Sequence, residues 1–110
     1  MNNTKNHVIE FAPFTLAEGV DESTLTAASD ALQAEFFSQQ KGFIKRELVK
    51  AVNGQWADVV YWDSMESVEQ AMQNAPDNPA ALKYFQLMVN TEHNDPSTEI
   101  MLLSAVRSYS

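Results

Sequence analysis

Apolar and polar residues follow one another along the chain in patterns that alternate between strand and helix. Residues 7–16 carry large apolar side chains on both faces of an extended segment, which predicts a buried first strand. Pro13 cannot donate to a ladder, so it marks an edge, a bulge or the unpaired end of that strand. Residues 21–41 repeat apolar side chains at helical spacing, with Asp21 as the predicted N-cap and Gly42 just beyond the C-terminus.

A predicted β-hairpin over residues 42–64 lies near the middle of the sequence. Asn53 and Gly54 both reach the positive φ of a type I′ turn at low steric cost, and a two-residue loop pairs Val52 with Gln55. One face of the hairpin then holds Phe43, Lys45, Glu47, Val49, Ala51, Trp56, Asp58, Val60 and Trp62. The other face holds Ile44, Arg46, Leu48, Lys50, Val52, Ala57, Val59 and Tyr61. We assign the first face to a ligand pocket and the second to a partner subunit.

Two further helices and a last strand complete the pattern. Ser64 caps the first of these helices, and Asn78-Pro79 supplies the N-cap and first residue of the second. A turn-rich loop over residues 91–97 leads to a last strand over residues 98–109, again apolar on both faces. This order predicts an α+β, ferredoxin-like β-α-β-β-α-β domain, in which helices cover one face of a four-stranded antiparallel sheet.

The second face of the predicted sheet is apolar, yet the helices of one chain can cover only the first. An exposed apolar face of that size would aggregate, so a second copy of the chain is the economical cover. We therefore predict a homodimer that packs sheet against sheet.

Composition narrows the possible partners. The chain of 110 residues suits one domain, its net charge of −8 argues against nucleic acid, and its seven Lys and Arg residues argue against a membrane surface. It has no Cys and only two His, so no metal site is expected. No apolar run approaches the length that spans a membrane. A cytoplasmic location is expected.

The hairpin also carries a resemblance to a known family. Gly42-Phe43 opens the second strand, and residues 59–64 (Val-Val-Tyr-Trp-Asp-Ser) end the third strand at a helix cap. The second pattern resembles the apolar-x-x-Trp-x-Ser signature of the antibiotic-biosynthesis-monooxygenase-like (ABM-like) proteins of the dimeric α/β-barrel superfamily. The resemblance covers nearly the whole chain in element order and is specific over residues 42–72. It implies one ABM-like domain over residues 1–110.

The resemblance also implies a class of chemistry. Cofactor-independent, quinone-forming oxygenases of this type line a pocket between sheet and helices with Asn, Trp, Tyr and Arg; Tyr61 and Trp62 lie in the corresponding strand, but a full set does not align. Haem-degrading members resemble one another in a Trp and a His on the helices after the third strand, and residues 65–87 contain neither. Haem degradation is therefore not expected, and no cofactor is implied.

Carboxylates and aromatic side chains make up the candidate site. A carboxylate on a buried sheet face can act as a general base near neutral pH, but an ion pair with Lys45 or a partner subunit would satisfy it without chemistry. Arg46 can hold an anionic substrate or join a salt bridge between subunits. The predicted pocket residues are Glu10, Glu47, Trp56, Asp58, Trp62 and Tyr84. The candidates for catalysis are Asp58, Tyr61 and Trp62.

Two kinds of function are consistent with this sequence. The first is a cofactor-independent monooxygenase or cyclase-like enzyme that acts on a small aromatic or polyketide-like molecule. The second is a homodimer without catalysis that binds a small ligand or serves in a stress response. Convergent Tyr, Asp and Trp groups in the pocket would favour chemistry, whereas a wholly apolar cavity would favour binding.

Overall fold

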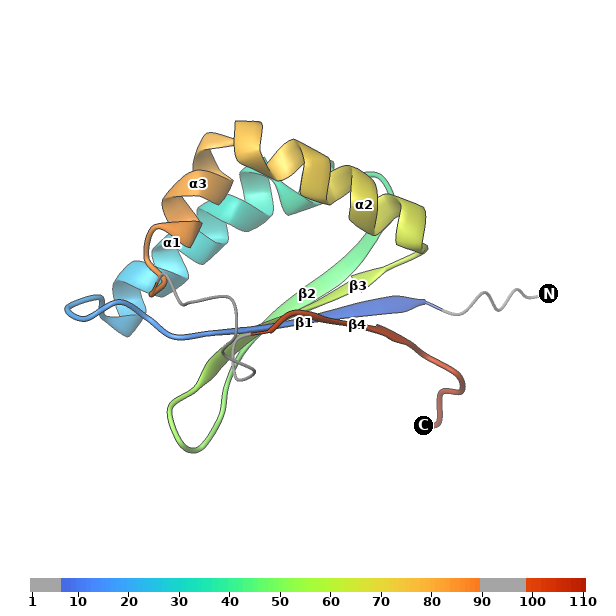
Figure 1. The fold of residues 1–110 in the computed structure, drawn as a ribbon, viewed down its shortest axis with the longest axis horizontal. Coiled ribbons are helices and arrows are strands. Elements are labelled where there is room, and N and C mark those ends of the chain that lie inside the picture. Colours follow the sequence, from blue (N-terminus) through green and yellow to red (C-terminus); the bar gives the residue numbers. More distant parts are fainter. Residues whose placement is uncertain (1–6, 90–98) are drawn as a thin grey trace.

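Helices cover one face of a four-stranded antiparallel sheet in the computed structural model, which describes residues 7–89 and 99–110 (Figure 1). The strands are β1 (Val8–Phe14), β2 (Phe43–Lys50), β3 (Trp56–Trp62) and β4 (Met101–Ser104), in the spatial order β2-β3-β1-β4. The helices are α1 (Glu22–Glu35), α2 (Met65–Asn74) and α3 (Pro79–Phe85), with short 3₁₀ helices η1 (Phe37–Gln39) and η2 (Ala75–Asp77). The ferredoxin-like prediction is confirmed.

The three predicted helix caps are present. Thr24 N–H donates to Asp21 Oδ1 (2.9 Å), Ser67 N–H to Ser64 Oγ (3.2 Å), and Ala81 N–H to Asn78 Oδ1 (3.0 Å). Each bond satisfies an amide that has no partner within its own helix. These polar residues therefore fix where each helix starts above the sheet.

The first helix is shorter than predicted. It ends at Glu35, not near Lys41, because Phe36 leaves the helical conformation with φ −127°. The break lets two adjacent aromatic side chains both turn inward: Phe36 is buried, and the Phe37 ring lies 6.0 Å from the Trp62 ring. Gly42 has the expected positive φ of 84°.

The hairpin loop contains three residues, so the predicted two-residue turn is wrong. Ala51 N–H donates to Gln55 O (2.7 Å), and among the loop residues Val52, Asn53 and Gly54 only Gly54 has positive φ. This geometry is the three-residue loop in which glycine takes the left-handed position. The pairing between β2 and β3 is therefore shifted by one residue from the predicted register.

The shift moves most of β2 to the opposite face from the predicted one. Arg46 pairs with Val60 and Leu48 with Asp58, so Arg46 and Leu48 share a face with Asp58. Lys45 and Glu47 lie on the face of Tyr61 instead, and their predicted place beside Asp58 is wrong. A β-bulge at Ile44 absorbs the extra residue and keeps Phe43 opposite Trp62.

The last strand is also shorter than predicted. It pairs with Val8–Phe11 of β1, and beyond Ser104 only the Ala105 amide continues the ladder, donating to His7 O (3.1 Å). Pro13 lies past this pairing, at the end of β1 that β4 does not reach. The predicted turn over residues 91–97 and Thr98 lie outside the described residues.

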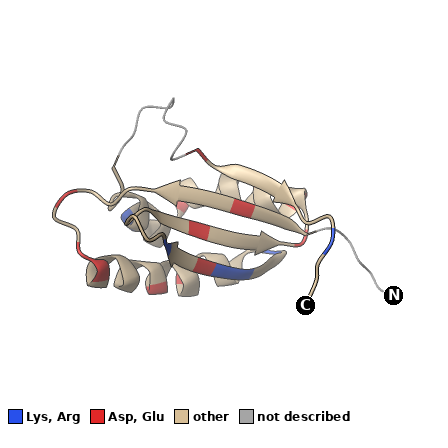
Figure 2. Ribbon diagram, turned by 90° about the horizontal axis from the view of Figure 1, so that it is seen from below, with Lys and Arg blue, Asp and Glu red and all other residues tan. Residues whose placement is uncertain are grey.

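The sheet divides the molecule into a covered and an open side. Under the helices lies a core that includes Leu25, Leu32, Phe36, Val60, Trp62, Val68 and Tyr84. Figure 2 views the molecule from the open side of the sheet, on which the strand register places the charged residues Lys45 and Glu47. The strand register places Ile9, Phe11, Val49, Val59, Tyr61, Met101 and Leu103 on this open face. Within the described ranges, no helix is long and apolar enough to cross a membrane.

Candidate functional site

A cavity of about 580 Å³ lies between the covered face of the sheet and the helices. Most of its wall is apolar, including Leu32, Phe36, Phe37, Val60, Met72 and Phe85. At its rim the side chains of Met72, Leu82, Phe85 and Ile100 remain 44–50% exposed. The volume lies within the roughly 300–1,000 Å³ of small-molecule sites, which are mainly apolar with a few placed polar groups.

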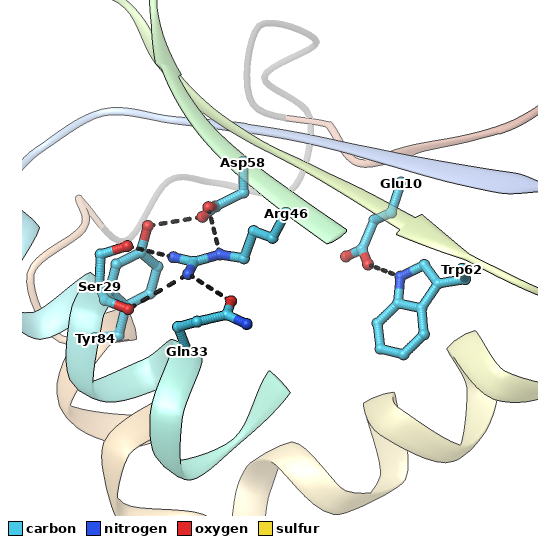
Figure 3. Close-up of polar contacts among 7 residues, drawn as sticks. All are labelled: Glu10, Ser29, Gln33, Arg46, Asp58, Trp62 and Tyr84. Carbon is cyan, nitrogen blue, oxygen red and sulfur yellow. Dashed lines mark hydrogen bonds and ion pairs between the residues drawn. The ribbon is translucent and has the colours of Figure 1, made fainter. Parts of the chain in front are cut away.

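Four polar side chains of the cavity come in two pairs. Tyr84 O–H donates to Asp58 Oδ2 (2.7 Å), and Trp62 Nε1–H donates to Glu10 Oε1 (3.1 Å) (Figure 3). Asp58 and Glu10 project from neighbouring strands, since β3 and β1 pair through this region, and all four residues line the cavity. The site thus holds two carboxylates, each with an aromatic donor.

The Asp58 pair belongs to a buried ionic network. Arg46 Nε–H donates to Asp58 Oδ1 (2.9 Å), and the exposed fractions of the two side chains are only 5% and 9%. The guanidinium also donates to Ser29 Oγ (2.6 Å) and Ser29 O (3.3 Å) and reaches Gln33 Oε1 (3.5 Å). Its central carbon lies 5.0 Å from the centroid of the Phe37 ring and 5.5 Å from that of Tyr84.

This network joins the sheet to two of the helices that cover it. Arg46 comes from β2, Asp58 from β3, Ser29 from α1 and Tyr84 from α3. Breaking a buried ion pair between a guanidinium and a carboxylate is costly, because removing either partner leaves the other charge buried without a counter-charge. The Arg46–Asp58 pair therefore holds α1 and α3 over the sheet and fixes one wall of the cavity.

Burial raises the pKa of both carboxylates, but different neighbouring groups oppose that rise at each. Burial raises the pKa of Asp58, and the Arg46 charge and the Tyr84 hydrogen bond oppose that rise. Burial also raises the pKa of Glu10; the Trp62 hydrogen bond lowers it, and the Asp58 charge raises it further. Burial and the neighbouring Asp58 charge raise the pKa of Tyr84, which keeps its phenol protonated as a donor.

The structure brings together some of the predicted site residues and separates others. Glu10, Asp58, Trp62 and Tyr84 line one cavity, and their role in binding a ligand stays a prediction. Trp56 is buried under the Lys50 ammonium, outside that lining. Glu47 accepts a hydrogen bond from Tyr61 O–H (3.4 Å) on the open face, so neither side chain reaches the cavity of its own chain.

Sequence reasoning missed the network around Arg46. The predicted register placed Arg46 at a subunit interface, and that placement is wrong. Ser29 and Gln33 were not singled out, although both lie on α1 one helical turn apart, facing a strand with a basic residue. Among the described residues, no three His, Asp or Glu side chains are grouped closely enough to hold a metal ion.

No protein-family model matches the chain, and no curated protein matches it in sequence. Among solved structures, SnoaB, a cofactor-independent oxygenase from Streptomyces nogalater, aligns with a TM-score of 0.72 at 17% identity, over 94% of this chain and 97% of that one. The "putative antibiotic biosynthesis monooxygenase" of Bordetella bronchiseptica aligns at 0.65 and 12% identity, over 96% of this chain and 100% of that one. A "putative monooxygenase" from Shewanella loihica aligns with a TM-score of 0.58 at 21% identity, also over 96% of this chain and 100% of that one.

These identities are low, so the likeness establishes the fold. The chain has the ferredoxin-like α+β fold of structures described as antibiotic biosynthesis monooxygenases, in agreement with the resemblance seen in its hairpin sequence.

Proposed function

We propose that this chain is a cofactor-independent, monooxygenase-like enzyme that acts on a small aromatic or polyketide-like molecule bound in the cavity. The observation that carries the proposal is the convergence of Glu10–Trp62 and Asp58–Tyr84 on one apolar pocket. Convergent polar groups in an apolar pocket are typical of a site that orients a substrate and takes part in its reaction. The fold shared with SnoaB, a cofactor-independent oxygenase, supports the same reaction class.

The chemistry suits a substrate that can itself reduce dioxygen. An activated CH₂ group and O₂ give a C=O group and one water molecule, so dioxygen is both the oxidant and the source of the new oxygen atom. The protein's part is to exclude water, hold the ring system against Phe36, Phe37 and Trp62, and supply polar contacts at its substituents.

Oxygen uptake with a hydroxyanthrone probe, dithranol, tests this proposal. We expect uptake above the rate in buffer, accompanied by the corresponding quinone. Met72→Trp should lower the rate several-fold because it fills the cavity rim, whereas Gln73→Trp, on an exposed neighbour outside the lining, should not. Uptake at the buffer rate, or equal rates in the two variants, would contradict the enzymatic role.

The second candidate, a ligand-binding or stress-related homodimer without catalysis, is favoured by the largely apolar wall of the cavity and its open apolar rim. It predicts a different result in the same experiment. Dithranol would bind stoichiometrically, Met72→Trp would abolish binding, and oxygen uptake would remain at the buffer rate.

We also propose that two copies of the chain pack through their open sheet faces. Val49, Met101 and Leu103 on this face are 39–49% exposed in one chain, and a partner sheet would remove them from water. Light scattering coupled to size-exclusion chromatography should report a dimer at micromolar concentration. Val59→Arg at the centre of the face should give monomers, while Val106→Arg, at an already exposed position beyond β4, should not. A monomeric parent chain would contradict this proposal.

A further inference from the structure

We propose that Glu10 is a specificity-determining residue whose carboxylate accepts a hydrogen bond from an aromatic hydroxyl group, so that the cavity selects hydroxyaromatic molecules over their ethers. This inference rests on the proposed function, because it concerns the ligand of the same cavity. It assigns to Glu10 the ligand contact that the sequence alone would give to Asp58.

Each oxygen of the Asp58 carboxylate already accepts from a buried side chain of the protein. Its Oδ1 accepts from Arg46 Nε–H at 2.9 Å and its Oδ2 from Tyr84 O–H at 2.7 Å, so both oxygens are already engaged (Figure 3). Breaking either bond to admit a ligand would leave a buried partner unsatisfied. The Asp58 carboxylate therefore serves the network that shapes the cavity.

Glu10 is half engaged. Trp62 Nε1–H holds Oε1 at 3.1 Å, and among the described residues no donor meets Oε2. The indole is 1% exposed and packed against the rings of Phe37 and Phe43, so it fixes the direction of the carboxylate. A carboxylate that is held by one oxygen and open at the other is a preformed acceptor on the cavity wall.

The surroundings of Glu10 favour a neutral donor. Its partners across the two adjacent strands, Val60 and Leu102, are apolar. From α2 and η2 the cavity receives only groups that do not ionise: Val68, Ala71, Met72, Ala75 and Pro76. Within the described part of the chain, Asp58 is the charged group that acts on Glu10, and its negative charge disfavours an anionic ligand. A neutral hydroxyl group on an aromatic ring satisfies Oε2 without bringing a second charge out of water.

Glu10 is a strong acceptor wherever its carboxylate is ionised. Burial and the Asp58 charge raise the pKa of Glu10 above its ordinary value, which makes its carboxylate a better hydrogen-bond acceptor than a solvated one. Hydrogen bonds to charged groups are roughly twice as strong as neutral ones. The preference for a hydroxyl should therefore fall as the pH drops through the pKa of Glu10.

Paired probes isolate this contact. We expect calorimetry at pH 8 to show that the wild type binds 2-naphthol about tenfold more tightly than 2-methoxynaphthalene, the gain typical of a charge-assisted hydrogen bond. Phenols titrate near pH 10, so 2-naphthol is still protonated there. In Glu10→Gln the ratio should shrink and lose its dependence on pH, while Glu69→Gln, an exposed carboxylate on α2, should keep the wild-type ratio.

A second variant tests the positioning role of Trp62. Trp62→Phe keeps an aromatic core side chain but removes the donor that lowers the pKa of Glu10. The pH at which the naphthol preference disappears should therefore move upward, a shift that a purely structural indole would not produce.

The outcomes separate the two proposals. Tight binding of both probes with the same ratio in the wild type and Glu10→Gln at every pH would overturn the assignment of Glu10 and leave the cavity as an aromatic site. Failure of both probes to bind would overturn the proposed cavity function, and the assignment of Glu10 with it.

Discussion

Asp58 and Glu10 lie on adjacent strands of one sheet and face one cavity, yet the protein uses them differently. Asp58 meets a buried cation and a phenol, so each of its oxygens has a donor. Glu10 accepts from one neutral indole donor, and no donor among the described residues meets its other oxygen. The number and charge of the donors, rather than burial alone, separate a carboxylate that supports the fold from one that is available to a ligand.

Asp58→Asn should have the largest effect, because it removes the charge of the carboxylate that supports the fold. It leaves the Arg46 guanidinium buried without a counter-charge, and the free energy of unfolding should fall by about 3 kcal/mol in urea denaturation. Asp30→Asn, at an exposed position of α1, should change it little. Adding Arg46→Met to the variant should recover much of the lost stability, since no charge of the pair then remains buried. A double variant less stable than Asp58→Asn alone would refute this explanation.

Tyr84→Phe should have the next largest effect. It keeps the ring that packs on Phe14 and Arg46 but removes the hydroxyl that donates to Asp58. The free energy of unfolding should fall by about 1–2 kcal/mol, the cost of leaving one buried acceptor underused. Tyr109→Phe, at a position 86% exposed, serves as the control and should leave the urea midpoint unchanged. Equal midpoints for both variants would remove Tyr84 from the network.

Glu10→Gln should have a smaller effect of opposite sign. The pKa of Glu10 in the folded chain lies above its unfolded value near 4.5, so between the two values the folded state binds more protons. Stability therefore falls as the pH rises through this window and stays lower above it. The variant should be more stable than the wild type above this window, at pH 8, and nearly equal to it at pH 4. If the stabilities of the wild type and Glu10→Gln differed by the same amount at every pH, the titration of Glu10 would not explain the difference. The control Glu69→Gln should reproduce the wild-type dependence of stability on pH.

The outline of the fold could be read from the sequence because its signals are local. Asp21, Ser64 and Asn78 each cap a helix through an amide three residues on, so neighbouring residues suffice to predict them. The four-stranded antiparallel sheet with helices on one face followed from the alternation of strands and helices along the chain. The end of α1 at Phe36 depends on how two aromatic rings pack toward the sheet, and the spacing of apolar residues along a helix carries no information on that packing.

The site could be predicted only in part because it depends on a register. Both faces of β2 and β3 carry apolar groups, so hydrophobic pattern did not choose between registers one residue apart. The turn residues Asn53-Gly54 fit a two-residue and a three-residue loop, and the structure contains the latter. Glu10 and Asp58 were named as candidates because the face that carries Trp56, Asp58 and Trp62 was assigned to the pocket. Arg46 was misplaced because a shift of one residue in the register moves its side chain to the opposite face.

The contact between Trp62 and Glu10 gives the molecule an optical reporter of its own. Trp62 is one of two tryptophans in the chain, and its indole N–H is bonded to the carboxylate in question. Ionisation of Glu10 changes the electric field along that indole, and hence its emission wavelength. In a Trp56→Phe background the remaining fluorescence would come from this one ring, so a simple emission titration would follow the charge of Glu10 and its occupation by a ligand.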